Sequence, residues 1–116
     1  MEKIILDTDF LITAIKYKID LFSELNRLCD FKKEVFIVDK TVEELKNKPQ
    51  EKLIREIIRE KHIKVIKTEN NKNVDDLLLE LEKTIVCTQD LELKKKIKKQ
   101  GRKVITIRQK KYLIYG

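Results

Sequence analysis

Short apolar runs alternate along the chain with longer segments in which apolar residues recur every three or four positions. The short runs have the length of buried strands, whereas the longer segments have the period of amphipathic helices. Strands are expected at 3–6, 34–38, 63–66, 84–88 and 103–107. Helices are expected at 9–16, 19–29, 39–48, 50–61, 75–82 and 90–100. Because strands and helices alternate, the pattern predicts an α/β domain with a mainly parallel sheet.

The ends of several elements carry signals of their own. Pro49 is expected to end one helix or to open the next, and Gly101 is expected to stop the helix at 90–100. The polar stretch 71–74 is expected to form a loop. The last apolar run, 111–115, is either an additional edge strand or a tail.

Length and composition restrict the class of protein. The chain has 116 residues, of which 41% are hydrophobic and 41% charged, so we expect one folded domain, 1–116, with a core of its own. Cys29 and Cys87 form no C-x-x-C pair, which excludes a zinc ribbon and a disulfide framework, and Cys87 is expected to be a buried thiol. No apolar run approaches 18 residues and no signal peptide is seen, so no membrane contact and a cytoplasmic location are expected.

The net charge of +7 is distributed unevenly along the chain. Residues 92–116 contain ten Lys or Arg and one acid, whereas the remaining residues contain 17 basic and 19 acidic groups. A basic excess confined to the last fifth of a chain indicates a partner made of nucleic acid or phosphate. The alternative is a solvated lysine-rich face, which is common in chains rich in Ile, Lys and Glu.

Carboxylates recur just after the predicted strands or at the starts of helices. The acids in such places are Asp7, Asp39, Glu44, Asp75, Asp76 and Asp90. Because the carboxyl ends of parallel strands share one rim, these acids are expected to gather there. Gathered carboxylates repel one another unless a cation lies among them, and oxygen ligands suit Mg²⁺ or Mn²⁺. His62, at a helix-to-strand junction, is expected at the surface rather than at a metal.

Each of these acids also has a simpler explanation as a helix cap or as a negative charge at a helix N-terminus. The candidate caps are Asp7 or Asp9, a Thr41-x-x-Glu44 capping box, Asn73 followed by Asp75 and Asp76, and Thr88 or Asp90. Capping does not explain why Asp7 directly follows a buried strand, or why an acid also follows the fourth strand. Both explanations are therefore kept at this point.

Four segments resemble the four acidic motifs of the PIN-domain nucleases, in the same order and over nearly the whole chain. They are "LDTDFL", "TVEELK", "VDDLLLEL" and "TQDLELKKKI". The segments "IKYKIDLFSELNRL" and "VDKTVEELK" are most similar to the branch that processes small-subunit rRNA in archaea and eukaryotes. The resemblance implies a three-layer α/β fold around a five-stranded parallel sheet of order 3-2-1-4-5. It also implies an endoribonuclease that cuts single-stranded RNA with Mg²⁺ or Mn²⁺.

The resemblance also assigns roles to single residues. It makes Asp7, Glu44, Asp75 and Asp90 the catalytic acids, holding one or two divalent ions, with Asp76 as the alternative to Asp75. The sequence departs from the family at Asp9, where Asn is usual, so an additional carboxylate is expected to face the metal. Thr8 and Thr88 adjoin the first and fourth acids and are expected to support the site.

The basic C-terminal part is expected to bind the RNA backbone and to make binding salt-dependent. The residues proposed for this contact are Lys94, Lys95, Lys98, Arg102, Arg108, Lys110, Lys111 and Tyr112. Tyr112 and Tyr115 are placed to stack on single-stranded bases or, as the favoured alternative, to pack in an edge strand. The resemblance also implies partners: pre-rRNA within a pre-ribosomal assembly, an antitoxin, or a second copy of the chain in a homodimer.

Other functions remain as alternatives. Within the same family, a VapBC-type toxin competes with an rRNA-processing factor, and a non-catalytic RNA-binding scaffold is a third reading that the intact set of acids disfavours. The "DTD" stretch also resembles haloacid-dehalogenase-type phosphatases, but Asp75 and Asp76 follow a polar loop where that family needs an apolar run. A receiver domain is disfavoured as well, because no acid directly follows the third predicted strand.

Overall fold

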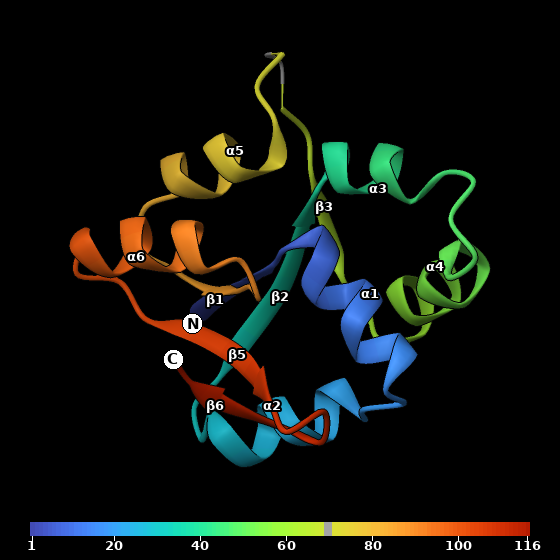
Figure 1. Cartoon of the computed structure of the whole chain (residues 1–116), viewed down its shortest axis with the longest axis horizontal. Helices are drawn as coiled ribbons and strands as arrows, with labels where there is room; N and C mark the ends of the chain where they lie inside the picture. Colours follow the sequence, from blue (N-terminus) through green and yellow to red (C-terminus); the bar gives the residue numbers. More distant parts are fainter. Residues whose placement is uncertain (69–70) are drawn as a thin grey trace.

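The computed structural model describes residues 1–68 and 71–116 and contains strands and helices in alternation (Figure 1). The strands are β1 (Glu2–Leu6), β2 (Lys33–Val38), β3 (Lys64–Ile66), β4 (Thr84–Cys87), β5 (Val104–Arg108) and β6 (Tyr112–Tyr115). The helices are α1 (Thr8–Lys16), α2 (Leu21–Leu28), α3 (Asp39–Leu45), α4 (Glu51–Glu60), α5 (Val74–Glu80) and α6 (Leu91–Lys99). None of these described helices is long and apolar enough to cross a lipid bilayer.

The predicted elements are confirmed, with differences of one to three residues at their ends. The largest is in the helix expected at 39–48, which ends at Leu45 because Lys46 leaves the helical conformation and Asn47 has φ 66°. The helix expected at 75–82 begins at Val74, one residue earlier, because Asn73 caps it. Such shifts are expected at helix ends, where capping contacts rather than periodicity fix the boundary.

The six strands form one sheet in the order β3-β2-β1-β4-β5-β6. The predicted order of the first five strands is confirmed, and each adjacent pair among them is parallel. The five parallel strands are confirmed, and the alternatives left open for 111–115 are resolved, because 112–115 forms an additional antiparallel edge strand beside β5. A tight turn at 109–111 makes this possible: Gln109 and Lys110 both have positive φ, and the Lys111 amide donates to the Arg108 carbonyl at 3.1 Å.

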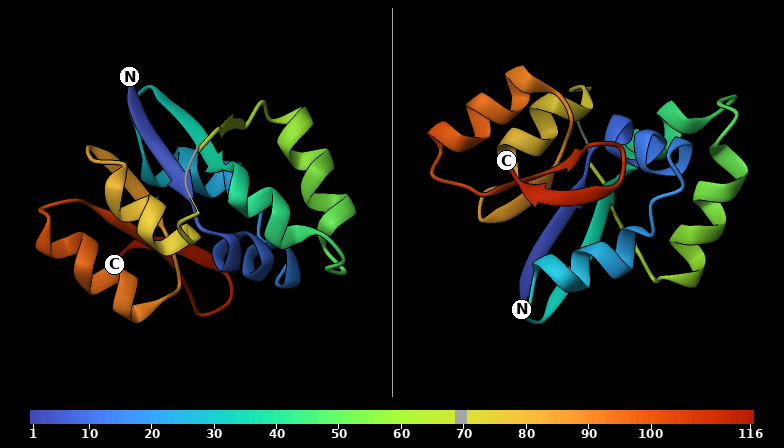
Figure 2. Two further views of the ribbon diagram at one scale, coloured as in Figure 1. Left: turned by 90° about the horizontal axis from the view of Figure 1, so that it is seen from above. Right: turned by 60° about the horizontal axis from the view of Figure 1, so that its bottom comes forward.

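The sheet is buried on both faces, which explains the uninterrupted apolar run of β1. Ile4 and Leu6 point into a core covered by α1 to α4, whereas Ile5 points into a second core covered by α5 and α6. Figure 2 shows these helices on opposite sides of the sheet. The predicted three-layer arrangement is thereby confirmed, and the order of the strands reverses at β1 and β4, where ligands bind in such sheets.

Helix α2 closes the outer edge of β6. The Glu24 carboxylate accepts a hydrogen bond from the Leu113 amide at 2.9 Å, and the Arg27 guanidinium donates one to the Leu113 carbonyl at 2.6 Å. Tyr115 lies against α2 as well, with its hydroxyl 3.4 Å from the Cys29 sulfur, and burial raises the pKa of this phenol to about 12. These contacts favour the packing role that was the preferred alternative for the C-terminal tyrosines.

Arg102 joins α5 to β4 at the end of the sheet away from the carboxyl rim. Its guanidinium donates hydrogen bonds to the carbonyls of Leu78, Leu79 and Thr84 and to the Thr84 hydroxyl, at 2.7–3.4 Å. The carbonyls at the end of α5 have no further turn of helix to bond to them. Arg102 thus stabilises the fold. It was expected to bind RNA, but the structure places it away from the carboxyl rim.

We expect Arg102→Ala to lower the free energy of unfolding by about 2–3 kcal/mol, because the carbonyls of Leu78 and Thr84 lose a side-chain donor at once and that of Leu79 keeps only the Gln100 amide. Lysine should restore only part of this loss, since an ammonium cannot span the same set of acceptors. Urea unfolding followed by circular dichroism measures the effect. Lys99→Ala, on the exposed end of α6, is the control and should change stability by no more than about 0.5 kcal/mol. An Arg102→Ala chain as stable as this control would contradict the assignment.

Candidate active site

Asp7 leaves the buried end of β1 and faces the point where the strand order reverses. Its amide donates to the Cys87 carbonyl of β4 at 2.9 Å, which holds the backbone at the centre of the sheet. The side chain is 4% exposed. One carboxylate oxygen caps α1 by accepting from the Thr8 amide at 2.8 Å, and the other accepts from the Thr88 hydroxyl at 2.7 Å. Asp7 is therefore a fixed group at the centre of the rim.

Asp90 reaches the same rim from the loop after β4. It caps α6 through Oδ1, which accepts from the amides of Glu92 and Leu93 at 2.9 and 3.2 Å. The cap uses only one of its two oxygens. The Thr88 hydroxyl, which donates to Asp7, also accepts a hydrogen bond from the Asp90 amide at 3.1 Å. Thr88 thus connects the acids that follow the two central strands.

Glu44 comes to the rim from α3, on the opposite side of Asp7. Its Oε1 accepts a hydrogen bond from the Thr8 hydroxyl at 2.6 Å, and the Thr8 oxygen lies 3.0 Å from the Thr41 hydroxyl oxygen. The expected Thr41-x-x-Glu44 capping box is wrong, because α3 begins at Asp39 and its N-cap residue Val38 makes no side-chain cap. The two residues are instead one helical turn apart and both point toward Thr8.

Helix α5 contributes Asp75 to the rim. Asn73 caps this helix by accepting from the Asp76 amide at 2.9 Å, and the cap fixes how the first turn is presented. Asp75 lines the pocket described below, whereas Asp76 does not. The structure therefore separates two adjacent acids that the sequence left as alternatives, although their assignment as ligands remains a proposal.

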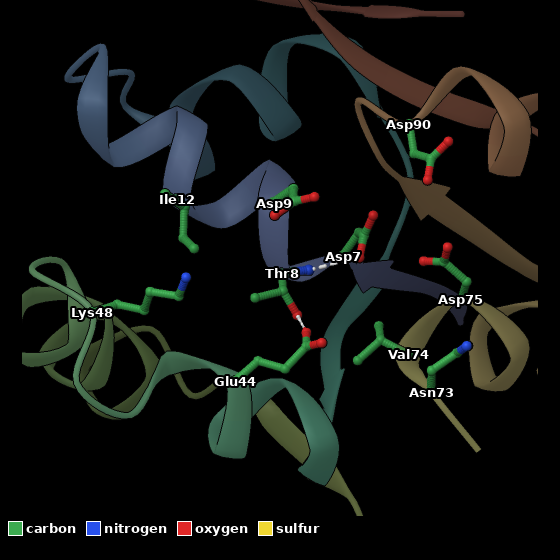
Figure 3. Close-up of a pocket in the computed structure, with 10 residues that line it drawn as sticks. All are labelled: Asp7, Thr8, Asp9, Ile12, Glu44, Lys48, Asn73, Val74, Asp75 and Asp90. Carbon is green, nitrogen blue, oxygen red and sulfur yellow. Dashed lines mark hydrogen bonds between the residues drawn. The ribbon is translucent and has the colours of Figure 1, made fainter.

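One pocket of about 470 Å³ brings these groups together (Figure 3). Its lining residues are Asp7, Thr8, Asp9, Ile12, Glu44, Lys48, Asn73, Val74, Asp75 and Asp90. Five of these carry carboxylates and one carries an ammonium group, so the pocket holds a concentrated negative charge. The pocket lies at the carboxyl ends of β1 and β4, where the topology places a ligand.

The raised pKa values of two acids in the pocket show that gathering these carboxylates is unfavourable. The pKa of Asp7 is raised to about 6, chiefly by burial and also by the charges of Asp75 and Asp9, while the hydrogen bonds from Thr88 and from the Thr8 amide act to lower it. Burial also raises the pKa of Asp75, as do the charges of Asp90 and Glu44. Carboxylates that come from several elements and repel one another at one place are typical of a site that holds a cation.

The chemistry of these side chains fits a hard divalent cation. The pocket offers carboxylate and hydroxyl oxygens from five segments of the chain and neither His nor Cys, the pattern that Mg²⁺ and Mn²⁺ prefer. In the described part of the chain, no three His, Cys, Asp or Glu side chains are gathered tightly enough to hold an ion as they stand. Asp9 and Asp75 are exposed residues that can adjust around an ion, whereas Asp7 is buried and Glu44 is held by the Thr8 hydroxyl.

One predicted acid lies elsewhere. Asp39, expected at the rim after β2, accepts hydrogen bonds from the Thr68 hydroxyl and amide at 2.6 and 3.0 Å. These bonds lower the pKa of Asp39 and tie the segment after β3 to the start of α3. Asp39 does not line the pocket, because its side chain is used by this local contact.

The basic residues expected to bind RNA are spread over two elements. Helix α6 begins at the carboxyl end of β4 and runs away from the rim. Along it lie Lys94, Lys95 and Lys98. Lys110 and Lys111 lie in the turn of the β5–β6 hairpin at the carboxyl end of β5, and Arg108 and Tyr112 flank it. The Lys110 ammonium lies 5.4 Å from the centre of the Tyr17 ring. The hairpin is thus on the same edge of the sheet as the pocket.

Two residues of the site were missed in the sequence. Lys48 lines the pocket from the segment after α3, and because α3 ends at Leu45 no helical spacing from Glu44 pointed to it. Thr41 was noticed only as a cap candidate, whereas its hydroxyl faces the pocket residue Thr8. The first omission followed from looking for cations only in the basic C-terminal part.

Comparisons with known proteins agree with one another. The family described as "PIN like domain" matches residues 4–110 of the chain. The chain is similar to "Ribonuclease VapC4" of Methanocaldococcus jannaschii, with 35% identity over 130 aligned positions that cover 100% of this chain and 98% of that protein. In three dimensions it is similar to the PIN domain endonuclease Utp24, with a TM-score of 0.83, 23% identity, and coverage of 97% of this chain and 90% of that one.

Proposed function

Because the chain belongs to the PIN-like domain family, we propose that it is a metal-dependent endoribonuclease that hydrolyses phosphodiester bonds in single-stranded RNA. The predicted family is confirmed by the match over 4–110 and by the 35% identity to a protein named as a ribonuclease. The observation that carries the proposal is the pocket in which Asp7, directly after β1, meets carboxylates from α1, α3, α5 and the β4–α6 loop.

In this proposal Asp7, Glu44, Asp75 and Asp90 hold one or two Mg²⁺ or Mn²⁺ ions, and Asp9 adds a further carboxylate. Asp76 remains close enough to raise the pKa of Asp75 and acts through that charge. When bound, the cation makes a water more acidic and neutralises charge on the phosphate that is attacked. The products would carry 5′-phosphate and 3′-hydroxyl ends.

The residues of the chain do the positioning. Thr88 holds Asp7 and the Asp90 backbone in one arrangement, and Thr8 holds Glu44. Since both oxygens of Asp7 already accept hydrogen bonds, its carboxylate is oriented before any ion arrives. Such preorganisation reduces the ordering that ion binding requires.

RNA would approach along the hairpin turn that bears Arg108, Lys110 and Lys111 and along the start of α6, with Lys94 and Lys95. The hairpin turn lies at the same edge of the sheet as the pocket, and α6 begins at that edge, so a strand crossing the rim can meet cations on its way. Contacts of this kind are to phosphate and carry little sequence information.

Lys48 is the cation nearest to the chemistry among the residues that line the pocket. We expect Lys48→Ala to weaken binding of single-stranded RNA about 3- to 10-fold and to lower the slope of log affinity against log salt by about one, as the loss of one phosphate contact predicts. Lys48→Arg should bind nearly as well as the unaltered chain. Fluorescence anisotropy in EDTA, where cleavage is stopped, measures both quantities.

The matched control for that variant is Lys46→Ala, which removes an exposed lysine from the same linker but not from the pocket. If Lys46→Ala and Lys48→Ala lower the affinity and the salt slope equally, Lys48 contributes only general charge and its proposed contact with RNA is wrong.

The biological setting has two candidates within the same chemistry. Processing of rRNA is favoured by the "IKYKIDL" segment and by the basic C-terminal part. A toxin partnered by an antitoxin is favoured by the full-length identity to a protein named VapC4. Cytoplasmic RNA is the proposed substrate pool in both cases, and two free buried cysteines fit a reducing compartment.

The test of the proposed function is a cleavage assay with labelled single-stranded RNA in Mn²⁺, in Mg²⁺ and in EDTA, beside duplex RNA of the same sequence. Cleavage of the single strand that requires the divalent ion supports the proposal. Binding of RNA without cleavage in any of these conditions would favour the non-catalytic scaffold, and cleavage that persists in EDTA would contradict a metal-dependent mechanism.

A further inference from the structure

A buried threonine behind the pocket is bonded to a pocket residue. Thr41 is 0% exposed, and the Thr8 hydroxyl oxygen lies 3.0 Å from its own hydroxyl oxygen. The Thr8 hydroxyl in turn donates to Glu44 Oε1 at 2.6 Å. A line of three polar groups therefore runs from the packed interior between α1 and α3 to a carboxylate at the rim.

The direction of the two hydrogen bonds follows from counting protons. Thr8 carries a single hydroxyl proton and cannot donate to both neighbours. The 2.6 Å separation from Glu44 is the shorter, as expected for a hydroxyl that donates to a carboxylate. The proton of Thr8 is therefore directed to Glu44, and the Thr41 hydroxyl donates to the oxygen of Thr8.

This chain of bonds fixes a side chain that would otherwise be free. Glu44 is an exposed residue with several rotatable bonds, and holding such a side chain in one rotamer costs on the order of 1–2 kcal/mol of entropy. The Thr8 hydroxyl holds Glu44 directly. Thr41 donates to the Thr8 oxygen, which fixes that oxygen and strengthens the hydrogen bond from Thr8 to Glu44.

We propose that Thr41 is a positioning residue of the active site, which sets the orientation of Glu44 through the Thr8 hydroxyl. This inference rests on the proposed function, because it concerns the use of Glu44 as a ligand. Thr41 does not line the pocket and touches neither ion nor substrate. Its effect is thus on how tightly the pocket holds a divalent ion, not on how RNA is bound.

Two variants separate the hydroxyl of Thr41 from its shape. Thr41→Val keeps the buried volume but removes the donor, whereas Thr41→Ser keeps the donor but removes a methyl group. We expect Thr41→Val to weaken Mn²⁺ binding to the protein alone about 10-fold, as is typical for groups that orient a metal ligand. Thr41→Ser should bind Mn²⁺ within about threefold of the unaltered chain.

The melting temperature should fall for Thr41→Ser and not for Thr41→Val, which is the reverse of the order expected for the loss of Mn²⁺ affinity. This reversal distinguishes a positioning role from a structural one. Without Thr41, the Thr8 hydroxyl still donates to Glu44 and no buried group loses its only partner, so Thr41→Val should leave the melting temperature of the metal-free protein within about 2 °C. Thr41→Ser leaves a small void in a fully buried place and should melt at a lower temperature.

The experiment measures Mn²⁺ binding by isothermal titration calorimetry and melting by circular dichroism for Thr41→Val, Thr41→Ser, Thr8→Val and the double variant. Because Thr41 acts through Thr8, adding Thr41→Val to Thr8→Val should cause no further loss of affinity. Thr84→Val, at the amino end of β4, is the control: it removes another buried hydroxyl and should lower stability without changing Mn²⁺ affinity.

The steady-state kinetics of cleavage add a second readout. Thr41→Val should raise the Mn²⁺ concentration for half-maximal activity while the KM for RNA stays unchanged. Mn²⁺ binding by Thr41→Val equal to that of the unaltered chain, or additive losses in the double variant, would overturn this inference alone. If the unaltered chain itself binds no Mn²⁺, the proposed function fails and the inference falls with it.

Discussion

Asp7→Asn is expected to abolish metal-dependent cleavage of RNA, with a loss of at least about 100-fold in kcat/KM. Changes in groups that merely orient metal ligands already cost about 10- to 100-fold, and Asp7 is placed to be a ligand itself. Asp7 lies at the centre of the rim, between Asp90 on one side and Glu44 on the other (Figure 3). An amide carries no charge to balance that of a cation, so the pocket should bind the ion poorly.

The variant is informative because the fold around it should persist. An Asn carbonyl can accept from the Thr8 amide, as Asp7 Oδ1 does, and an Asn amide can donate to the Thr88 hydroxyl oxygen. Circular dichroism establishes that the variant is folded, and the RNA cleavage assay in Mn²⁺ gives the rate. Asp30→Asn, which removes one exposed negative charge from the loop after α2, is the charge-matched control.

The control should cleave RNA at the rate of the unaltered chain. If Asp7→Asn retains cleavage within threefold of Asp30→Asn, the site proposed at the carboxyl ends of β1 and β4 is wrong. A loss of cleavage together with a loss of helical signal would point instead to a failure to fold, and Asp75→Asn, an exposed residue of the same pocket, then provides the test.

The same variant is expected to make the metal-free protein more stable at pH 7, by about 1–3 kcal/mol. Burial holds the pKa of Asp7 near 6, above its ordinary value of 3.8. Between these values the folded chain binds more protons than the unfolded chain, so the stability of the wild type falls as pH rises from about 4 to about 6. A pKa raised from 3.8 to about 6 corresponds to roughly 3 kcal/mol as an upper value.

Because Asn does not titrate, the stability of Asp7→Asn should not fall in this way as pH rises from about 4 to about 6. We therefore expect the two proteins to be equally stable within about 0.5 kcal/mol near pH 4 and to diverge as pH rises through 6. Urea unfolding in EDTA at pH 4, 5, 6 and 7 measures the difference. The lowered pKa of Asp39 makes both proteins less stable at low pH, and because both contain Asp39 this effect cancels.

Adding Mn²⁺ should reduce or reverse the difference at pH 7, because an ion that binds only the folded wild type stabilises it by mass action. An Asp7→Asn protein no more stable than wild type at pH 7 in EDTA would mean that the buried carboxylate is not strained. The paired outcome, activity lost and stability gained, is the signature of a residue kept for function at the expense of the fold.

The sequence alone was sufficient for the order and type of the elements. Ile4, Ile5 and Leu6 form an uninterrupted apolar run because β1 is buried on both faces, and α6 shows Leu93 and Ile97 at helical spacing. These are local patterns, and a residue's side of a strand or helix follows directly from its position in the pattern. Parallel topology and the shared rim then follow from the alternation of strands and helices.

The sequence also predicted which acids stand at strand ends, but not how each is used. Asp7 and Asp90 serve both as helix caps and as pocket residues, so the two explanations considered for them were not alternatives. A carboxylate has two oxygens and can cap a helix with one while the other faces elsewhere. Nothing in the local pattern distinguishes that case from a simple cap.

Only the tertiary structure decided the remaining assignments. Asp75 rather than Asp76 lines the pocket. Asp39 accepts hydrogen bonds from Thr68, and Arg102 donates hydrogen bonds to carbonyls of α5 and β4. The tertiary structure also brought Thr41 against Thr8 across 33 positions of sequence. The physical reason is common to all of them: periodicity fixes the face on which a side chain lies, whereas its hydrogen-bond partner depends on which other segment packs there.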